Sequence, residues 1–205
     1  MIAIIDYGVG NLFSLRSSLT HLGLEAVVTA DAQTIRKADR LILPGVGAFG
    51  DAMDKLSATG LVPVIREQAA QKPLLGICLG MQLLFEKSYE YGEHGGLGFV
   101  KGEVCPLEPD LKDKTLKVPQ IGWNALHIVR DDPLFRYIRE GEEGEYVYYV
   151  HSYYGKNCTE STLAVSDYSI PVTGVVRAGR VYGTQFHPEK SGETGLRILR
   201  AFAEL

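Results

Sequence analysis

Short apolar runs that end in glycine or proline constrain the fold of this chain most. Strands without polar alternation are typical of a parallel sheet that is covered on both faces. The runs that predict such strands are residues 2–5, 25–29, 40–43 and 74–78. Helical patterns lie between or beside them, at residues 12–22, 51–56 and 62–70. The first half therefore predicts parallel strands joined by right-handed helical crossovers.

The second half has a different pattern. Residues 101–187 are rich in strand-like runs, and Ala178-Gly179 separates the last two as in a hairpin. Residues 191–204 predict a final helix, with Ser191 as its N-cap and Leu196, Leu199 and Phe202 on one face. We expect residues 1–205 to form a single α/β domain, whose central sheet is mixed, mostly parallel and flanked by helices.

Composition excludes several classes of function. The 205 residues carry a formal charge of −4, so nothing in the charge balance points to nucleic acid or to a membrane surface. No apolar run approaches the ~20 residues that span a bilayer. Three cysteines without a CxxC pair argue against a disulfide framework or a zinc site, and Cys105 and Cys158 are interpreted as inert. We expect a cytoplasmic protein without a metal.

Residues 76–80 (GICLG) match the cysteine form of the nucleophile elbow, G-x-S-x-G. An apolar strand precedes the motif, and residues 81–86 are expected to be helical. A sharp turn there would expose the sulfur of Cys78, and the helix N-terminus would favour its thiolate. The N–H of Leu79 would then face an oxyanion formed beside the sulfur. A buried structural cysteine at a strand end is the alternative, and the motif alone leaves both open.

A thiolate nucleophile needs a base, and the base needs a group that orients it. His187 ends the strand-like run VYGTQF at residues 181–186 and is followed by Pro188-Glu189. Side chains two residues apart in an extended segment point the same way, so Glu189 is expected near the imidazole. Cys78, His187 and Glu189 thus predict a triad, although the sequence leaves open whether Glu189 bonds the ring. The remaining histidines are interpreted as structural or surface residues: His21, His94, His127 and His151.

Residues 45–50 (GVGAFG) match the G-x-G-x-x-G pattern of dinucleotide-binding sites. The segment follows the third expected strand rather than the first, and the acidic residue expected at a strand end about 20 residues later is missing. We therefore expect Gly45 and Gly47 to let the backbone approach a substrate, with N–H groups directed at an oxyanion. No cofactor is expected.

Together these motifs resemble the class I (triad) glutamine amidotransferases. The resemblance rests on GICLGMQ at residues 76–82 and FHPE at residues 186–189. It implies the fold of that family and the roles of three residues. Cys78 would attack the side-chain amide of glutamine and release ammonia, His187 would protonate the leaving nitrogen and later activate water, and Glu189 would orient His187.

Segments along the whole chain further resemble one subfamily, the glutaminase subunits of imidazole glycerol phosphate synthases in histidine biosynthesis. They are DYGVGN at 6–11, LPGVGAFG at 43–50, PQIGWN at 119–124, VHSYY at 150–154 and FHPEKS at 186–191. The resemblance implies that Gln82 and Glu90 bind glutamine in a pocket that is also lined by Gly45, Val46, Gly47, Ser152 and Tyr153. It implies a partner, the cyclase subunit, which is a (β/α)₈ barrel. Asn11, Trp123 and Lys190 would contact it, although Trp123 could equally be a packing residue.

Two other interpretations remain. The triad could serve the amidotransferase subunit of another pathway, such as anthranilate or pyridoxal phosphate synthesis, or a γ-glutamyl hydrolase. The segments at 6–11, 119–124 and 186–191 favour histidine biosynthesis. A regulatory domain that binds glutamine or a nucleotide is the non-enzymatic alternative, but it would have no use for a complete triad. Because free hydrolysis would waste glutamine, we expect the loop at residues 45–47 to supply its oxyanion N–H only when the partner is docked.

Overall fold

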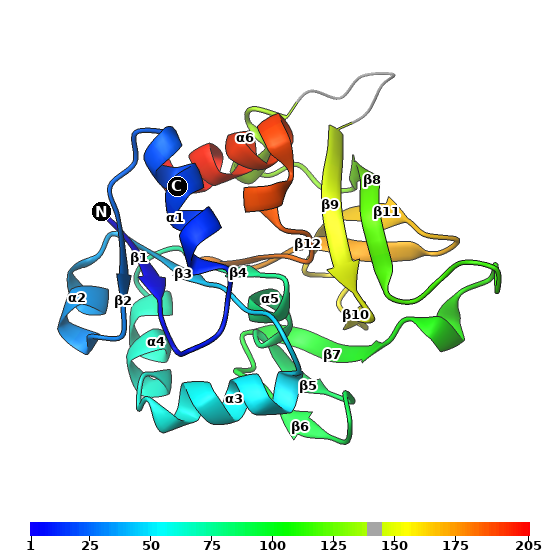
Figure 1. Cartoon of the computed structure of the whole chain (residues 1–205), viewed down its shortest axis with the longest axis horizontal. Coiled ribbons are helices and arrows are strands. Elements are labelled where there is room, and N and C mark those ends of the chain that lie inside the picture. The colour runs from blue at the N-terminus through cyan, green and yellow to red at the C-terminus, as the bar shows by residue number, and fades with distance from the viewer. Residues whose placement is uncertain (139–144) are drawn as a thin grey trace.

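The computed structural model describes residues 1–138 and 145–205, which form an α/β fold with one large sheet and one small sheet (Figure 1). The large sheet contains β1 (Ile2–Ile5), β2 (Ala26–Thr29), β3 (Arg40–Leu43), β4 (Leu74–Ile77), β8 (Gln120–Ile128), β9 (Glu145–His151), β11 (Thr162–Asp167), β12 (Pro171–Ala178) and β13 (Val181–Thr184). Its strand order is β2-β1-β3-β4-β13-β12-β11-β8-β9. The expected mixed α/β sheet is therefore confirmed.

The sheet has a parallel half and an antiparallel half. The four pairings from β2 to β13 are parallel, and the four from β13 to β9 are antiparallel. The sheet is thus less parallel than the mostly parallel sheet that the sequence predicts. Short connections such as Ala178–Val181 explain the difference, because a tight hairpin can only join antiparallel strands.

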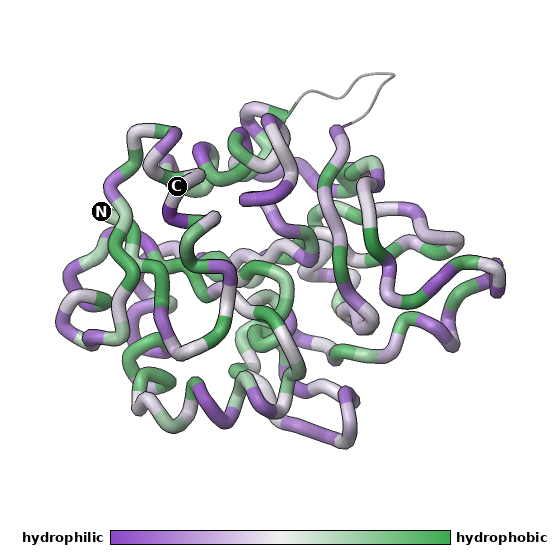
Figure 2. Tube along the Cα trace, in the orientation of Figure 1, coloured by the Kyte–Doolittle hydropathy of each residue, from purple (hydrophilic) through white to green (hydrophobic). Residues whose placement is uncertain are grey.

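Helices cover both faces of the parallel half. They are α1 (Leu12–His21), α2 (Ala32–Lys37), α3 (Phe49–Ala58), α4 (Val62–Ala69), α5 (Leu79–Gln82) and α6 (Gly192–Ala203). Alternate residues of β1 pack on opposite faces: Ala3 and Ile5 lie in a core with α2, α3 and α4, whereas Ile2 and Ile4 lie in a core with α1 and α6. Figure 2 shows hydrophobic residues concentrated in these interior strands. This double burial is why the strands lack polar alternation.

The small sheet has the order β10-β7-β5-β6. Its strands are β5 (Phe85–Ser88), β6 (His94–Gly95), β7 (Val100–Pro106) and β10 (Tyr153–Lys156), and three short 3₁₀ helices complete the described elements: η1 (Glu108–Asp110), η2 (Pro133–Phe135) and η3 (Pro188–Lys190). Among the described residues, no helix combines the length and the apolar character that a membrane span requires.

Local expectations fail where pairing or capping decides the structure. Residues 81–86 are not one helix: α5 ends at Gln82, and Phe85 pairs with Val100 in the small sheet. The unexpected helix α2 begins after Asp31, whose carboxylate accepts the N–H of Thr34 over 2.7 Å. In α6, Leu199 and Phe202 face the core as expected, but Leu196 is only half-buried.

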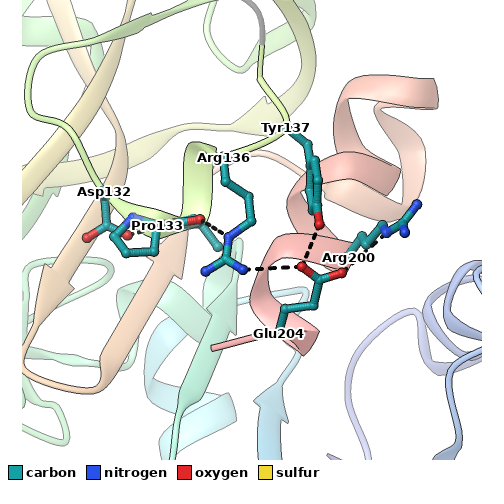
Figure 3. Close-up of polar contacts among 7 residues, drawn as sticks. Asp132, Pro133, Arg136, Tyr137, Arg200 and Glu204 are labelled. Atoms are coloured by element: carbon teal, nitrogen blue, oxygen red, sulfur yellow. Dashed lines mark hydrogen bonds and ion pairs between the residues drawn. The ribbon is translucent and has the colours of Figure 1, made fainter.

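The C-terminal end of α6 is tied to the segment around η2 (Figure 3). Glu204 accepts hydrogen bonds from the hydroxyl of Tyr137 over 2.6 Å and from Arg136 over 3.3 Å. Arg200 adds a contact of 3.3 Å to the same carboxylate, and Arg136 Nε donates to the carbonyl oxygen of Pro133. These bonds fix one end of the helix whose other end follows His187 and Glu189.

Candidate active site

Cys78 stands at the turn between β4 and α5. Its backbone has φ +54° and ψ −113°, a conformation that costs a non-glycine residue about 1–3 kcal/mol. A Cβ on Gly80 would collide with the carbonyl oxygen of Leu43, and one on Gly76 would lie 2.6 Å from the carbonyl oxygen of Gly80. The sequence predicts a sharp turn here, and glycine is required on both sides of the cysteine because the backbones pack directly against each other.

Three neighbouring parallel strands carry the candidate residues to one edge of the sheet. The order β3-β4-β13 places the glycine loop, Cys78 and residues 185–187 side by side, because parallel strands share their carboxyl edge. The N–H of Cys78 donates to the carbonyl oxygen of Thr184 over 2.7 Å. The elbow is thereby fixed to the strand that leads to His187.

His187 and Glu189 form a buried pair beside this elbow. His187 Nδ1 lies 2.8 Å from Glu189 Oε1, and the two side chains are 2% and 3% exposed. Burial alone would lower the pKa of His187, but the hydrogen bonds and negative charges of Cys78 and Glu189 outweigh it and raise that pKa to about 10. These contacts therefore favour the imidazolium form of His187 at neutral pH.

Ser191 fixes the backbone of this histidine. Its hydroxyl donates to the carbonyl oxygen of His187 over 2.6 Å and accepts the N–H of Tyr148 over 2.9 Å. The N–H of His187 in turn donates to the carbonyl oxygen of Tyr148. Ser191 does precede α6, as the sequence predicts, but its side chain makes no capping bond. The hydroxyl holds His187 in place instead.

Cys78 is one of the residues that line a cavity of about 380 Å³. This volume lies in the range of small-molecule sites. The lining residues are Val46, Gly47, Cys78, Leu79, Gln82, Glu90, Pro119, Val150, His151, Ser152, Tyr153, His187 and Lys190. Most of the residues that the sequence assigns to the nucleophile, its base and the glutamine pocket are thus brought together.

Gln82 and Glu90 line the cavity, and hydrogen bonds to other residues fix their side chains. Gln82 Nε2 donates to the carbonyl oxygen of Tyr153 over 2.9 Å and to Gln185 Oε1 over 3.0 Å. Glu90 Oε2 accepts the N–H of Phe49, the first residue of α3, over 2.7 Å. Burial raises the pKa of Glu90 above its ordinary value. Both side chains are therefore held in place before any ligand binds.

Some residues of the glycine loop at 45–50, which follows β3, line the cavity, and others pack closely against neighbouring residues. Val46 and Gly47 line the cavity, but Gly45 lies beneath it, where a Cβ would be 2.6 Å from the backbone nitrogen of Gly80. A Cβ on Gly50 would lie 2.8 Å from the imidazole of His94. Close packing thus explains the first and third glycines of the G-x-G-x-x-G pattern without a dinucleotide.

The structure adds His151 to the site, although the sequence interpretation treats it as an ordinary structural histidine. It lines the cavity at the end of β9 and contacts the carbonyl oxygen of Tyr153 over 2.8 Å and Gln120 Oε1 over 3.0 Å. Burial lowers the pKa of His151 to about 4. The alternation of β9 could have indicated this position, since Val147, Tyr149 and His151 are its buried residues.

Two of the three residues that the sequence assigns to a partner surface contact the same tyrosine ring. Trp123 is 53% exposed on β8, and its ring meets the edge of Tyr148 at a centroid distance of 5.9 Å. Lys190 Nζ lies 5.9 Å from the centre of the same tyrosine ring and also lines the cavity. Asn11 precedes α1, which packs against η3. Lys190 thus lies between the exposed tryptophan and the cavity.

Comparison with known proteins gives consistent matches over almost the whole chain. The model of the family described as "Glutamine amidotransferase class-I" matches residues 3–204. The imidazole glycerol phosphate synthase subunit HisH of Listeria monocytogenes is 48% identical, with 100% of this chain and 96% of the relative aligned. The corresponding subunit of Wolinella succinogenes is 45% identical over the full length of both chains. That of Bacillus cereus is 49% identical, with 98% of this chain and 93% of the relative aligned.

Solved structures give the same fold at low sequence identity. A glutamine amidotransferase structure superposes with a TM-score of 0.75 at 20% identity and covers 100% of this chain and 98% of its own. The structure of PurLQS from Thermotoga maritima also gives 0.75, at 18% identity, and covers 99% of this chain and 97% of its own.

Proposed function

Because this chain belongs to the class-I glutamine amidotransferase family, we propose that it is the glutaminase subunit of an imidazole glycerol phosphate synthase in histidine biosynthesis. It hydrolyses glutamine to glutamate and ammonia. It passes the ammonia to a cyclase subunit that makes imidazole glycerol phosphate and AICAR. Residues 1–205 act as one domain, and the enzyme works in the cytoplasm.

One observation carries the chemistry: the buried pair of His187 and Glu189 lies beside a cysteine that opens into the cavity. The sulfur of Cys78 attacks the side-chain amide carbon of glutamine and forms a C–S bond. The imidazolium of His187 gives its proton to the amide nitrogen, the C–N bond breaks, and ammonia leaves.

The second half of the reaction restores the resting state. Neutral His187 accepts a proton from water while the water oxygen attacks the glutamyl thioester. The C–S bond breaks, glutamate leaves, and Cys78 is again a thiolate beside an imidazolium. Glu189 stabilises that imidazolium through its 2.8 Å contact to Nδ1. No step of this cycle uses a cofactor.

The tetrahedral intermediate needs hydrogen-bond donors for its oxyanion. The N–H of Leu79 is the first at the start of α5, and Leu79 lines the cavity beside Cys78. The loop of Gly45, Val46 and Gly47 supplies a further N–H. Gly47 has φ +97°, a conformation suited to glycine, and its missing side chain leaves open space. The loop can therefore rearrange, and docking of the partner shifts it to the state that completes the oxyanion hole.

Glutamine binds with its side-chain amide at Cys78. Gln82 and Glu90 accept hydrogen bonds from its N–H groups, and Ser152 and Tyr153 line the same wall of the cavity. Glu90 provides the negative charge that an α-amino group requires.

The partner is the cyclase subunit, a (β/α)₈ barrel, and the complex is a heterodimer. The outer face of β8 and β9 supports this assignment, because it exposes Ile121, Trp123 and Tyr146 on two paired strands. Lys190 joins this face to the cavity, and Asn11 lies at the start of α1 nearby. A partner that covers Trp123 and Lys190 would close the mouth of the site.

Purification with the cyclase tests the proposal. Glutamate release is measured for the isolated chain, for the complex, and for the complex with its nucleotide substrate. We expect an equimolar complex whose hydrolysis rate exceeds that of the isolated chain by about 5- to 150-fold, the usual range of allosteric coupling. Full activity of the isolated chain would contradict the gating, and absence of a complex would contradict the partner. Absence of glutamate release in all three samples would contradict the glutaminase.

A further inference from the structure

The mechanism above does not use Gln185, although the buried amide of this residue lies beside the sulfur of Cys78. It follows β13, precedes His187 by two residues, and is completely shielded from solvent. A buried amide needs hydrogen-bond partners, since burial of an unpaired polar group destabilises the folded state. The partners of Gln185 are the two functional side chains on either side of it, Gln82 and Cys78.

The carbonyl oxygen of Tyr153 determines which group donates and which accepts in the hydrogen bonds that link it to Gln82, Gln185 and Cys78. The carbonyl oxygen of Tyr153 can only accept, so Gln82 must present its Nε2 there, at 2.9 Å. The second N–H of Gln82 then donates to Gln185 Oε1 over 3.0 Å. Gln185 is left with its Nε2 facing the sulfur of Cys78, at 3.9 Å.

The same hydrogen bonds orient the side chain of Gln82 toward the cavity. Both N–H groups of the Gln82 amide are used by Tyr153 and Gln185. Its Oε1 makes no hydrogen bond with any residue in the described ranges, and Gln82 lines the cavity. Gln82 Oε1 is thus free to accept a hydrogen bond from the ligand, and Gln185 Nε2 donates toward the sulfur of Cys78.

We propose that Gln185 is a positioning residue for two groups of the site, the sulfur of Cys78 and the side-chain amide of Gln82. Through Nε2 it holds the Cys78 thiolate, and through Oε1 it turns the carbonyl oxygen of Gln82 toward the bound glutamine. The effect on glutamine rests on the proposed function, whereas the effect on the sulfur does not. An N–H donor favours a thiolate over a thiol, so loss of Gln185 makes Cys78 less reactive.

Two substitutions separate these effects from a structural role. Gln185→Met keeps the size of the side chain but removes both hydrogen bonds. Gln185→Glu keeps an oxygen that accepts from Gln82. Gln68→Met is the matched control, because Gln68 is another buried glutamine, on α4 and outside the cavity lining. All three are compared with the wild type by urea unfolding before any assay.

We expect Gln185→Met to raise KM for glutamine about tenfold in the complex and to slow iodoacetamide labelling of Cys78 about three- to tenfold at pH 7. Gln185→Glu returns KM to within about twofold of the wild type, and Gln68→Met leaves both quantities unchanged. Labelling is followed on the Cys78 peptide by mass spectrometry, which separates it from Cys105 and Cys158. Wild-type KM and wild-type labelling in Gln185→Met would overturn the proposal, as would an uncorrected KM in Gln185→Glu.

A measurement on the wild-type chain covers the case in which Gln185→Met does not fold. Alkylation of Cys78 should shift the side-chain amide resonance of Gln185 in a ¹⁵N correlation spectrum, with Gln68 as the internal reference. An unshifted Gln185 amide would overturn the contact to sulfur. Labelling and spectrum need no glutamine turnover, so they give an answer even if the wild-type complex proves not to hydrolyse glutamine.

Discussion

His187 Nδ1 lies 2.8 Å from Glu189 Oε1, and both side chains are buried where the 3₁₀ turn begins at the intervening Pro188. The second carboxylate oxygen, Glu189 Oε2, is buried without a hydrogen-bond partner among the described residues. A carboxylate that is desolvated in this way interacts strongly with the imidazolium. Glu189 therefore stabilises the imidazolium form of His187, which carries the proton that the leaving ammonia requires.

Replacement of Glu189 by Gln should remove this charge while it preserves the shape of the side chain. We expect kcat for glutamine hydrolysis by the complex to fall by about 10²- to 10⁴-fold, with KM within about threefold of the wild type. Steady-state glutamate release measures both. Glu193→Gln, on the exposed first turn of α6, is the control. A Glu189→Gln enzyme with near-normal kcat would remove Glu189 from the mechanism.

His151 should make stability depend on pH. Burial lowers its pKa from 6.5 to about 4. Between these two pH values the imidazole is mostly protonated in the unfolded chain and mostly neutral in the folded chain. Its contribution to stability is complete above pH 6.5 and is lost as the pH falls toward 4, with a slope of at most about 1.4 kcal/mol per pH unit. Urea unfolding of the wild type and of His151→Asn at pH 7 and pH 5 measures the difference. His21→Asn, at an exposed position, should follow the wild type; an identical slope in His151→Asn would refute the assignment.

Gly80 should tolerate no side chain. A Cβ there would overlap the carbonyl oxygen of Leu43, and both backbones are buried. We expect Gly80→Ala to lower the free energy of unfolding by about 3 kcal/mol or more, because the elbow must move away from β3. Gly95→Ala is the matched control, since a Cβ on Gly95 meets open space. Equal urea midpoints for the two variants would contradict the close packing of the elbow.

Trp123 should contribute more to partner binding than to the fold. Its side chain is 53% exposed and touches Tyr148 only with a ring edge. We expect Trp123→Ala to raise the Kd for the cyclase by about 30-fold or more, with an unchanged urea midpoint of the isolated chain. Val129→Ala, another exposed apolar residue just beyond β8, is the comparison. Similar Kd values for both variants would place the docking surface elsewhere.

The parallel half of the fold and the core of the site follow from local sequence patterns. Continuous apolar runs predict buried parallel strands, and the carboxyl ends of such strands lie at one edge. That rule alone brings Cys78 after β4 and His187 after β13 to the same place. The spacing of His187 and Glu189 also indicates their proximity, although only the structure gives the bond between them.

Contacts between distant segments decide what the sequence could not give. The direction of the Gln185 amide depends on Gln82 and on a carbonyl oxygen of Tyr153, in two other parts of the chain. Phe85 follows a helical pattern but pairs with β7, because the small sheet offers it partners that a helix would not. Antiparallel pairing in the second half depends on connection length, which apolar periodicity does not report.

The most direct test of the central claim compares two nitrogen sources in one complex. Cys78→Ala is assembled with the cyclase, and formation of imidazole glycerol phosphate is measured with glutamine and, separately, with an ammonium salt. The proposed mechanism predicts that synthesis from glutamine falls to background while synthesis from ammonia stays at the wild-type rate. Persistent glutamine-dependent synthesis would contradict Cys78 as the nucleophile, and loss of both activities would show that Cys78 maintains the structure of the complex instead.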